Sequence, residues 1–254
     1  MPNRVAVGLT ANHWPDGSRR SALHCLSPMT QPQPTQHSNL NPSIPSPLVI
    51  GVCGGIASGK SVVTHHLEQL GAAVIHADQI GHAVLKDPEV IDLLLKHFGN
   101  EIRSPDNQDQ LSRSAIATKV FGDSPIAKSN LQFLESVTHP RIRQIIRSQL
   151  QQLRQATPPP SVIVLDVPLL FESGWHSECD KIVFVETPWN QRLQRARQRG
   201  WTEEQLIARE EAQMPVHEKE KRSSVTLQNT GTLSDFQNQI THWFRQITAK
   251  PTAP

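Results

Sequence analysis

Residues 48–61 read Leu48-Val49-Ile50-Gly51-Val52-Cys53-Gly54-Gly55-Ile56-Ala57-Ser58-Gly59-Lys60-Ser61, and this stretch decides the fold class. Its first half is a short apolar run, which is typical of a strand buried in a parallel sheet. Its second half matches the pattern GxxxxGK[ST], and the segment 61–70, which has a helix-like composition, follows directly. A strand, this loop and a helix in this order predict a binding site for nucleotide phosphates, and the surrounding elements make a chance match less frequent.

The residue types of the loop fit this chemistry. Glycines let successive backbone N–H groups point into one anion-sized hollow, and the next helix adds positive charge from its N-terminus. We expect Lys60 to reach the β- and γ-phosphates and to act in catalysis, and the Ser61 hydroxyl to bind Mg²⁺. The expected nucleotide contacts are Gly54, Gly55, Ile56, Ala57, Ser58, Gly59, Lys60 and Ser61.

The rest of the chain alternates strand and helix, which predicts a three-layer α/β domain with a parallel sheet. Further strands are predicted at 73–77, 161–166, 181–185 and 225–228, and a last amphipathic helix at 236–247. The stretch 79–155 is mostly helical and too long for a simple crossover, so it forms an accessory lobe. A second accessory region, at about 190–215, is rich in arginine. The folded domain is expected to cover 48–249.

Composition excludes several classes of protein. The 254 residues carry a net charge of only +2, which does not support a whole-protein grip on nucleic acid. No run of about eighteen apolar residues is present, so no membrane span is expected. The three cysteines form no CxxC pair and predict neither a disulfide framework nor a zinc site. We expect a cytoplasmic monomer.

The N-terminal extension, residues 1–47, holds eight of the 20 prolines and has no hydrophobic period. Such a segment cannot offset its ordering entropy, so we expect it to be disordered, as we do the tail at 250–254. Two alternatives remain for the extension. It is poor in acids and carries three arginines, as transit peptides do, although it lacks an amphipathic pattern. It could also be untranslated, with Met29 as the true start.

Two aspartates follow predicted strands and therefore lie at the carboxyl edge of the sheet, where α/β proteins bind ligands. Asp78 follows the strand 73–77 and can take the proton of an acceptor hydroxyl. The alternative is that Asp78 caps the next helix. Asp166 closes the strand 161–166 and is placed to hold Mg²⁺, with strand-end capping as its alternative.

Two groups of basic residues accompany these acids. His139-Pro140-Arg141-Ile142-Arg143 lies within the helical stretch, where the proline is expected to force a break and the cations to hold acceptor phosphates. Arg192, Arg195, Arg197 and Arg199 have no acid among them, and Arg209 follows. This predicts a mobile lid at about 190–215, the lid segment, which closes over the triphosphate. A solvated helix face is the alternative for both groups, and a nucleic-acid patch for the second.

Taken together, these residues resemble the dephospho-CoA kinase family. The family's loop Gly-Gly-Ile-x-Ser-Gly-Lys-Ser matches 54–61, its His-Pro pair matches His139-Pro140, and its Asp-Val-Pro-Leu-Leu-Phe-Glu run matches Asp166–Glu172. The resemblance covers about 48–244. Two departures are present. His76-Ala77-Asp78 keeps only the second acid of the family's Asp-Ala-Asp, and Gln228 replaces the Asp that precedes Asn229 near the adenine of ATP.

The resemblance implies ATP- and Mg²⁺-dependent phosphorylation of the ribose 3′-hydroxyl of dephospho-CoA, giving CoA and ADP. It implies a P-loop core with a five-stranded parallel sheet, a helical CoA-binding lobe and an Arg-rich lid. ATP contacts are expected from Arg195, Arg199, Arg209 and Asn229, with Arg199 catalytic, and acceptor contacts from Asp78, His82, His139 and Arg143. The alternatives are another small-molecule kinase, acting on a nucleoside or nucleotide, and a non-catalytic ATP-binding regulator.

Overall fold

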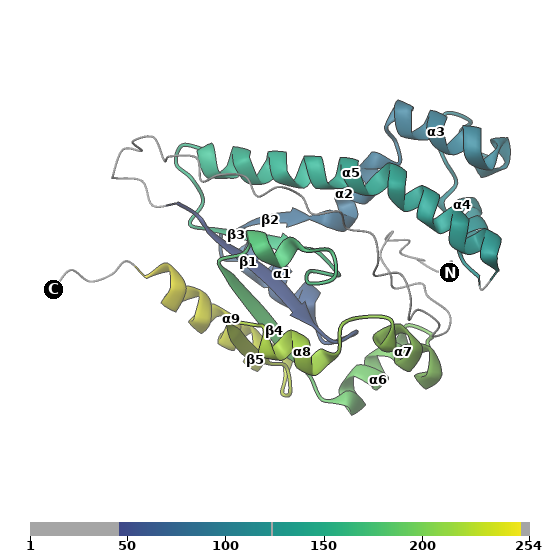
Figure 1. Ribbon diagram of the computed structural model, residues 1–254. Coiled ribbons are helices and arrows are strands. Elements are labelled where there is room, and N and C mark those ends of the chain that lie inside the picture. Colours follow the sequence, from purple (N-terminus) through teal and green to yellow (C-terminus); the bar gives the residue numbers. More distant parts are fainter. Residues whose placement is uncertain (1–45, 123, 250–254) are drawn as a thin grey trace, which may run out of the picture.

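The computed structural model describes residues 46–122 and 124–249. Apart from Ser46 and Pro47, the predicted disordered ends at 1–47 and 250–254 lie outside the described residues. The predicted five-stranded parallel sheet is confirmed, with strand order β2-β3-β1-β4-β5 (Figure 1). Its strands are β1 (Leu48–Gly54), β2 (Ala73–His76), β3 (Val162–Asp166), β4 (Lys181–Glu186) and β5 (Val225–Gln228). Within these ranges no helix is long and apolar enough to cross a membrane.

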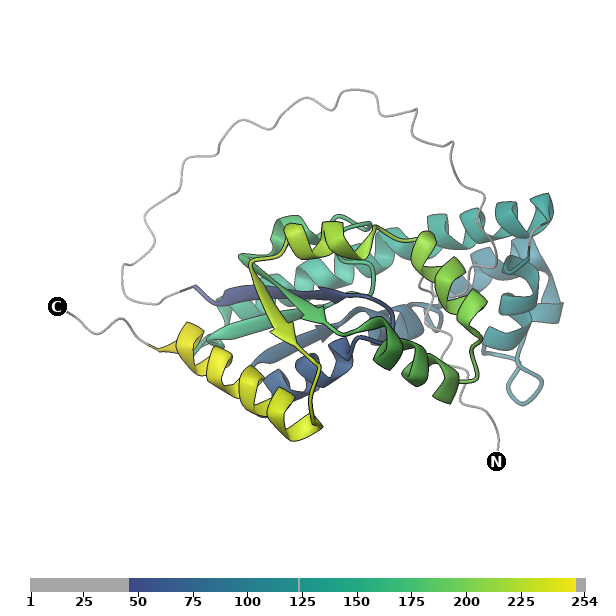
Figure 2. The same ribbon diagram turned by 90° about the horizontal axis from the view of Figure 1, so that it is seen from below.

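Helices bury both faces of the sheet. Since successive residues of each strand point to opposite sides, one strand contributes to the hydrophobic cluster on each face. On β1, Val49 and Cys53 pack into one hydrophobic cluster, whereas Ile50 and Val52 pack into the other. The first cluster includes residues of the helices inserted between β2 and β3. The second is covered by α1 (Lys60–Gln69) and α9 (Leu233–Thr248), which pack against each other (Figure 2). The result is the expected three-layer arrangement.

The helical stretch between β2 and β3 forms several elements. They are α2 (Ala77–Val84), α3 (Pro88–Phe98), the short 3₁₀ helix η2 (Asn100–Ile102), α4 (Arg113–Val120) and α5 (Pro125–Gln155). Figure 1 shows α5 running along the sheet and then beyond it, where α3 and α4 lie beside its N-terminal half. Because α2 and α5 also contact each other, the stretch encloses a space next to the carboxyl end of β2.

The expected break at Pro140 is wrong, since α5 continues through it. Proline removes the N–H that would pair with the carbonyl four residues earlier, at Ser136. Ser136 and Pro140 are both exposed, so water can satisfy that carbonyl. Buried side chains on both sides of the proline, Leu134 and Ile146, pack into the same hydrophobic cluster and hold the helix continuous.

The lid segment forms α6 (Trp189–Gln198) and α7 (Glu203–Glu211), and α8 (Val216–Lys221) leads on to β5. A small hydrophobic cluster of Ile56, Ala57, Leu193, Ala196 and Leu206 packs both helices against the phosphate loop. The arginines of α6 have no acid among them in the sequence, but α7 supplies acidic partners, with Glu210 pairing with Arg192 and Glu203 with Arg197.

Candidate active site

The phosphate loop, residues 54–61, connects β1 to α1 at the carboxyl edge of the sheet. Gly59 has a φ of 101°, and a Cβ there would lie 2.4 Å from Asn229 Nδ2, so both conformation and space require glycine. Lys60 begins α1, and its Nζ turns back to donate to the carbonyls of Gly54 (3.1 Å) and Gly55 (2.9 Å). Ser61 is exposed in the first turn of α1. The loop thus carries the Lys60 ammonium group, turned back onto loop carbonyls, and the exposed hydroxyl of Ser61.

The pKa of the Lys60 ammonium group is lower than that of an ordinary lysine. Burial, and after it the positive charge of Lys219, lowers the pKa of Lys60 to about 8. Lys219 lies in α8 and is 3% exposed, and its Nζ lies 2.9 Å from Gln213 Oε1 and 3.0 Å from Glu172 Oε1. Sequence reasoning missed Lys219, because the run Val216–Lys221 has the charge pattern of a solvated helix.

The outer side of the loop is held by residues from distant parts of the chain. Arg195 Nη1 donates to the carbonyls of Ala57 and Ser58, both at 3.2 Å. The Ser58 carbonyl also accepts from Thr187 Oγ1 and from Asn229 Nδ2, each at 2.7 Å. Arg195 Nη2 lies 3.3 Å from Asn229 Oδ1, which joins two of these partners. The structure therefore brings the predicted residues Arg195 and Asn229 to the loop, with Thr187 as an additional residue.

The two other predicted arginines of the lid segment differ in their surroundings. Arg199 caps the C-terminus of α6 and is exposed, and its charge, after burial, lowers the pKa of Arg195. Arg209 stacks on Trp201, with its guanidinium carbon 4.0 Å from the ring centroid. Burial lowers the pKa of Arg209, and its Nη1 is buried without a hydrogen-bond partner in the part of the chain that the structure describes. A buried donor in this state is suited to an anion.

Asp78 lies in the first turn of α2 and not at the end of β2. The N-cap of α2 is His76, so the alternative that Asp78 caps this helix is wrong. His76 Nδ1 lies 3.1 Å from Asp166 Oδ2, and the two residues are paired in register across β2 and β3. Burial, and after it the negative charge of Asp166, raises the pKa of Asp78. The two predicted aspartates are thus electrostatic neighbours at one edge of the sheet.

A cavity of 140 Å³ opens beside Asp78. Its wall is formed by α2, α5 and the loop after β3, and most of it is apolar. Arg143 donates from Nη2 to the Ser173 carbonyl at 2.9 Å and lies over the ring of Trp175. Among the residues that line the cavity are Asp78, His139, Ile142, Arg143, Ile146 and Trp175. Three predicted residues, Asp78, His139 and Arg143, therefore meet in one cavity.

Two basic residues near the cavity do not line it. His82 lies one turn after Asp78, and its Nε2 is 3.0 Å from Arg113 Nη1. Arg141 forms ion pairs with Asp87 and Glu89 at the start of α3. Arg141 therefore does not share the corner with His139 and Arg143 that the sequence predicted, because neighbouring residues of a helix point in different directions.

The residues predicted to hold Mg²⁺ fit a site that is shared with a nucleotide. Within 46–122 and 124–249, no three His, Cys, Asp or Glu side chains converge on a possible metal position. Mg²⁺ in kinases is commonly held by one or two protein oxygens together with substrate phosphates. The Asp166 carboxylate at the end of β3 and the Ser61 hydroxyl in the first turn of α1 are oxygens of this kind, and α1 follows β1, the strand that pairs with β3.

Comparison with known proteins agrees with this geometry. The sequence model of the dephospho-CoA kinase family matches residues 48–235. Curated dephospho-CoA kinases from Rhodopirellula baltica and Carboxydothermus hydrogenoformans are 35% identical over 212 residues and 36% identical over 194 residues. These alignments cover 84% and 76% of this chain, and 95% and 90% of the relatives.

Solved structures share the fold of this chain. The crystal structure of TT1252 from Thermus thermophilus is 32% identical, with a TM-score of 0.64, and the match covers 81% of this chain and all of that one. Dephospho-CoA kinase from Campylobacter jejuni has the same fold at 24% identity and a TM-score of 0.58, over 78% of this chain and 96% of its own. The family resemblance expected from the sequence is confirmed: this chain belongs to the dephospho-CoA kinase family.

Proposed function

We propose that this chain transfers the γ-phosphoryl group of ATP to the ribose 3′-hydroxyl of dephospho-CoA, the last step of coenzyme A synthesis. The observation that carries the proposal is the position of Asp78, which lines the apolar cavity at the same sheet edge as the phosphate loop. The hydroxyl oxygen forms a bond to the γ-phosphorus, and the bond from that phosphorus to the β–γ bridging oxygen breaks. The hydroxyl proton passes to Asp78, and ADP leaves.

On the ATP side, the loop backbone binds the phosphates, apart from the Ile56 amide, which donates to Glu210, and Lys60 supplies positive charge to the transferring group. Arg209 has an unused buried donor for the same group, and Arg199 adds charge from the end of α6. Arg195 and Asn229 fix the loop from outside. Positioning and charge neutralisation account for most of the catalysis in reactions of this class.

Mg²⁺ is the metal that this site suits, with Ser61 and Asp166 as its protein ligands. When bound, Mg²⁺ neutralises charge on the β- and γ-phosphates. Burial, and after it the negative charge of Asp166, raises the pKa of Asp78 and makes it a stronger base. Because Mg²⁺ on Asp166 would offset the charge of that carboxylate, burial is the cause that would remain with the metal bound. His76 holds Asp166 in place through its ring nitrogen.

On the acceptor side, Ile142, Ile146 and Trp175 offer an apolar surface, and His139 and Arg143 offer positive or hydrogen-bonding groups for the acceptor's phosphates. His82, on the same helix as Asp78 but outside the lining of the cavity, would contact a part of the acceptor that extends beyond the cavity. Because one chain supplies both sides of the site, we propose a monomer. We also propose that it works in the cytoplasm, without a membrane or nucleic-acid partner.

The test is an acceptor panel. The protein is incubated with Mg-ATP and, separately, dephospho-CoA, nucleosides or nucleoside monophosphates, and ADP is measured with Lys60→Ala as the control for this site. We expect ADP formation that depends on dephospho-CoA and is lost in the Lys60→Ala protein. ADP formed only with a nucleoside or nucleotide would show another small-molecule kinase. ATP binding without acceptor-dependent ADP would show a regulator.

A further inference from the structure

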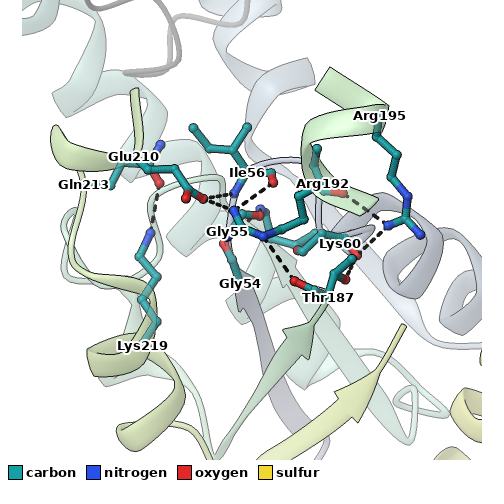
Figure 3. Close-up of polar contacts among 12 residues, drawn as sticks. Gly54, Gly55, Ile56, Lys60, Thr187, Arg192, Arg195, Glu210, Gln213 and Lys219 are labelled. Atoms are coloured by element: carbon teal, nitrogen blue, oxygen red, sulfur yellow. Dashed lines mark hydrogen bonds and ion pairs between the residues drawn. The ribbon is translucent and has the colours of Figure 1, made fainter. Parts of the chain in front are cut away.

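A carboxylate of the lid segment is hydrogen-bonded directly to the backbone of the phosphate loop. Glu210 Oε1 accepts from the Ile56 amide at 2.9 Å and from Arg192 Nη1 (Figure 3). The pair is well buried, with the Arg192 side chain 9% exposed and that of Glu210 16% exposed. Sequence reasoning gave Glu210 no role, since it precedes another acid in a polar helix. Its bond to the loop spans 154 positions of the sequence, so only the tertiary structure reveals it.

The guanidinium group of Arg192 is held by two backbone carbonyls and an aromatic ring in addition to Glu210. Its Nε donates to the Thr187 carbonyl at 3.2 Å, its Nη1 lies 3.5 Å from the Ile56 carbonyl, and its guanidinium carbon lies 5.1 Å from the Trp189 ring centroid. A Cβ on Gly55 would lie 2.7 Å from Arg192 Nη1 and 2.9 Å from Glu210 Oε1. The glycine at 55 therefore makes room for this ion pair as well as for a phosphate.

The pair connects the last turn of α7 to the phosphate loop, and that turn carries Arg209 next to Glu210. Arg209 is held from its other side by Trp201. A buried ion pair is weak evidence for stability, because removing two charges from water costs about as much as their attraction returns. A role in fixing one arrangement explains better why this pair is buried against the loop.

We propose that Glu210 is a positioning residue for phosphoryl transfer: together with Arg192 it joins α7 to the phosphate loop at Ile56 and so sets Arg209 against the phosphates. The inference rests on the proposed function in one respect, which is that Arg209 binds the phosphates of ATP. It adds a residue that does not touch the reacting atoms but fixes one that does. The lid segment is then a part of the loop's support and not a free flap.

The chain offers a matched control. Arg197 and Glu203 form a second ion pair between the same two helices, at 3.2 Å, but these side chains are 62% and 41% exposed and do not contact the loop. Glu210→Gln keeps size and one acceptor oxygen and removes the charge. Glu203→Gln makes the same change where only a surface pair is lost.

The experiment is a double-mutant cycle between Glu210 and Arg209, read as the Kd for Mg-ATP by calorimetry and as kcat with dephospho-CoA. We expect Glu210→Gln to weaken ATP binding or lower kcat by about fivefold or more, and Glu203→Gln to change neither by more than about twofold. In an Arg209→Ala background, Glu210→Gln should have an effect of less than about twofold, since the residue that it positions is gone. Circular dichroism melting shows whether each variant is folded, and Arg192→Met/Glu210→Met removes both charges if Glu210→Gln alone fails to fold.

The outcomes distinguish a failure of the proposed function from a failure of the positioning role of Glu210. If wild type shows no acceptor-dependent ADP, the proposed function fails, and the cycle is still read from ATP binding. If Arg209→Ala matches wild type in both readouts, Arg209 has no role and the positioning of it by Glu210 is refuted. Two outcomes overturn the inference alone. In the first, Arg209→Ala is impaired while Glu210→Gln behaves like Glu203→Gln. In the second, the effects of Arg209→Ala and Glu210→Gln multiply in the double variant, which shows that Glu210 does not act through Arg209.

Discussion

Replacing Lys219 by methionine should move the alkaline limit of activity to higher pH. The positive charge of Lys219 is, after burial, the second cause of the low pKa of Lys60, about 8. With dephospho-CoA saturating, the profile of kcat/KM for ATP against pH reports groups of the enzyme form that ATP binds, the complex with dephospho-CoA, in which Lys60 must be charged to receive phosphates. With a pKa of about 8, the ammonium form is about nine-tenths populated at pH 7 and about one-tenth at pH 9. In wild type, kcat/KM should therefore fall about tenfold for each pH unit above that value.

The assay is kcat/KM for ATP between pH 6 and 10, at saturating dephospho-CoA, for wild type, Lys219→Met and Lys221→Met. Lys221 lies two residues further along α8 and is exposed, so it is the matched control. Because the methionine leaves the Glu172 carboxylate without its cation, Lys219→Met/Glu172→Gln serves as a second variant. Burial raises the pKa of the Cys53 thiol from its ordinary value of 9.0, so Cys53 does not account for a fall in activity that begins near pH 8.

If the alkaline fall in kcat/KM stays at the same pH in both Lys219 variants, the explanation is refuted. It is also refuted if Lys221→Met moves this fall as far as Lys219→Met does. Stability gives an independent check on the sign. The folded-state pKa of Lys60 is below its unfolded value of 10.5, so between pH 8 and 10.5 the unfolded chain binds more protons. The contribution of Lys60 to the free energy of unfolding should therefore rise with pH across this window, and less so in Lys219→Met.

Three further outcomes follow from the site. Asp78→Asn should lower kcat by about a hundredfold, with the Kd for ATP and the melting temperature nearly unchanged, because the N-cap position of α2 is His76 and not Asp78; activity within a few-fold of wild type would move the base elsewhere. Asp166→Asn should raise the Mg²⁺ concentration needed for half-maximal rate by about tenfold, measured by Mg²⁺ titration at fixed ATP, and an unchanged requirement would contradict its role as a ligand. Lys60→Ala should keep its circular dichroism spectrum and lose about a hundredfold or more in turnover, since its ammonium group contacts only loop carbonyls in this structure; near-normal turnover would contradict this.

Sequence reasoning reached most of the fold because its signals are local. The apolar run 48–53 and the glycines after it define β1 and the loop, and the strand patterns at 161–166 and 181–185 need no knowledge of distant residues. Pro140 is the exception. The rule that proline breaks a helix is local too, but packing of Leu134 and Ile146 into one hydrophobic cluster outweighed it.

The site was predictable only where a residue's role follows from its neighbours in sequence. Lys60 and Asp166 belong to such motifs, and the cavity contains Asp78, His139 and Arg143 as expected. Arg192 shows the limit of this approach. A cluster of like charges on α6 predicted repulsion and movement, yet the acid that balances Arg192 lies on another helix. Sequence spacing within one helix carries no information on a partner in the next.

The phosphate loop depends both on its local sequence pattern and on contacts from distant parts of the chain. Its pattern specifies the side that faces a nucleotide, where glycines and one lysine are required. Its outer side is specified by Thr187, Arg195, Glu210 and Asn229, which bind the backbone of residues 56–58 from 129 to 171 positions away in the sequence. A P-loop pattern alone therefore identifies phosphate binding, whereas the residues that hold the loop come from the lid segment and from the ends of β4 and β5. Because the same lid segment carries Arg209, a change on the outer side of the loop should reach catalysis without touching a substrate, and Glu210 is the residue at which this can be measured.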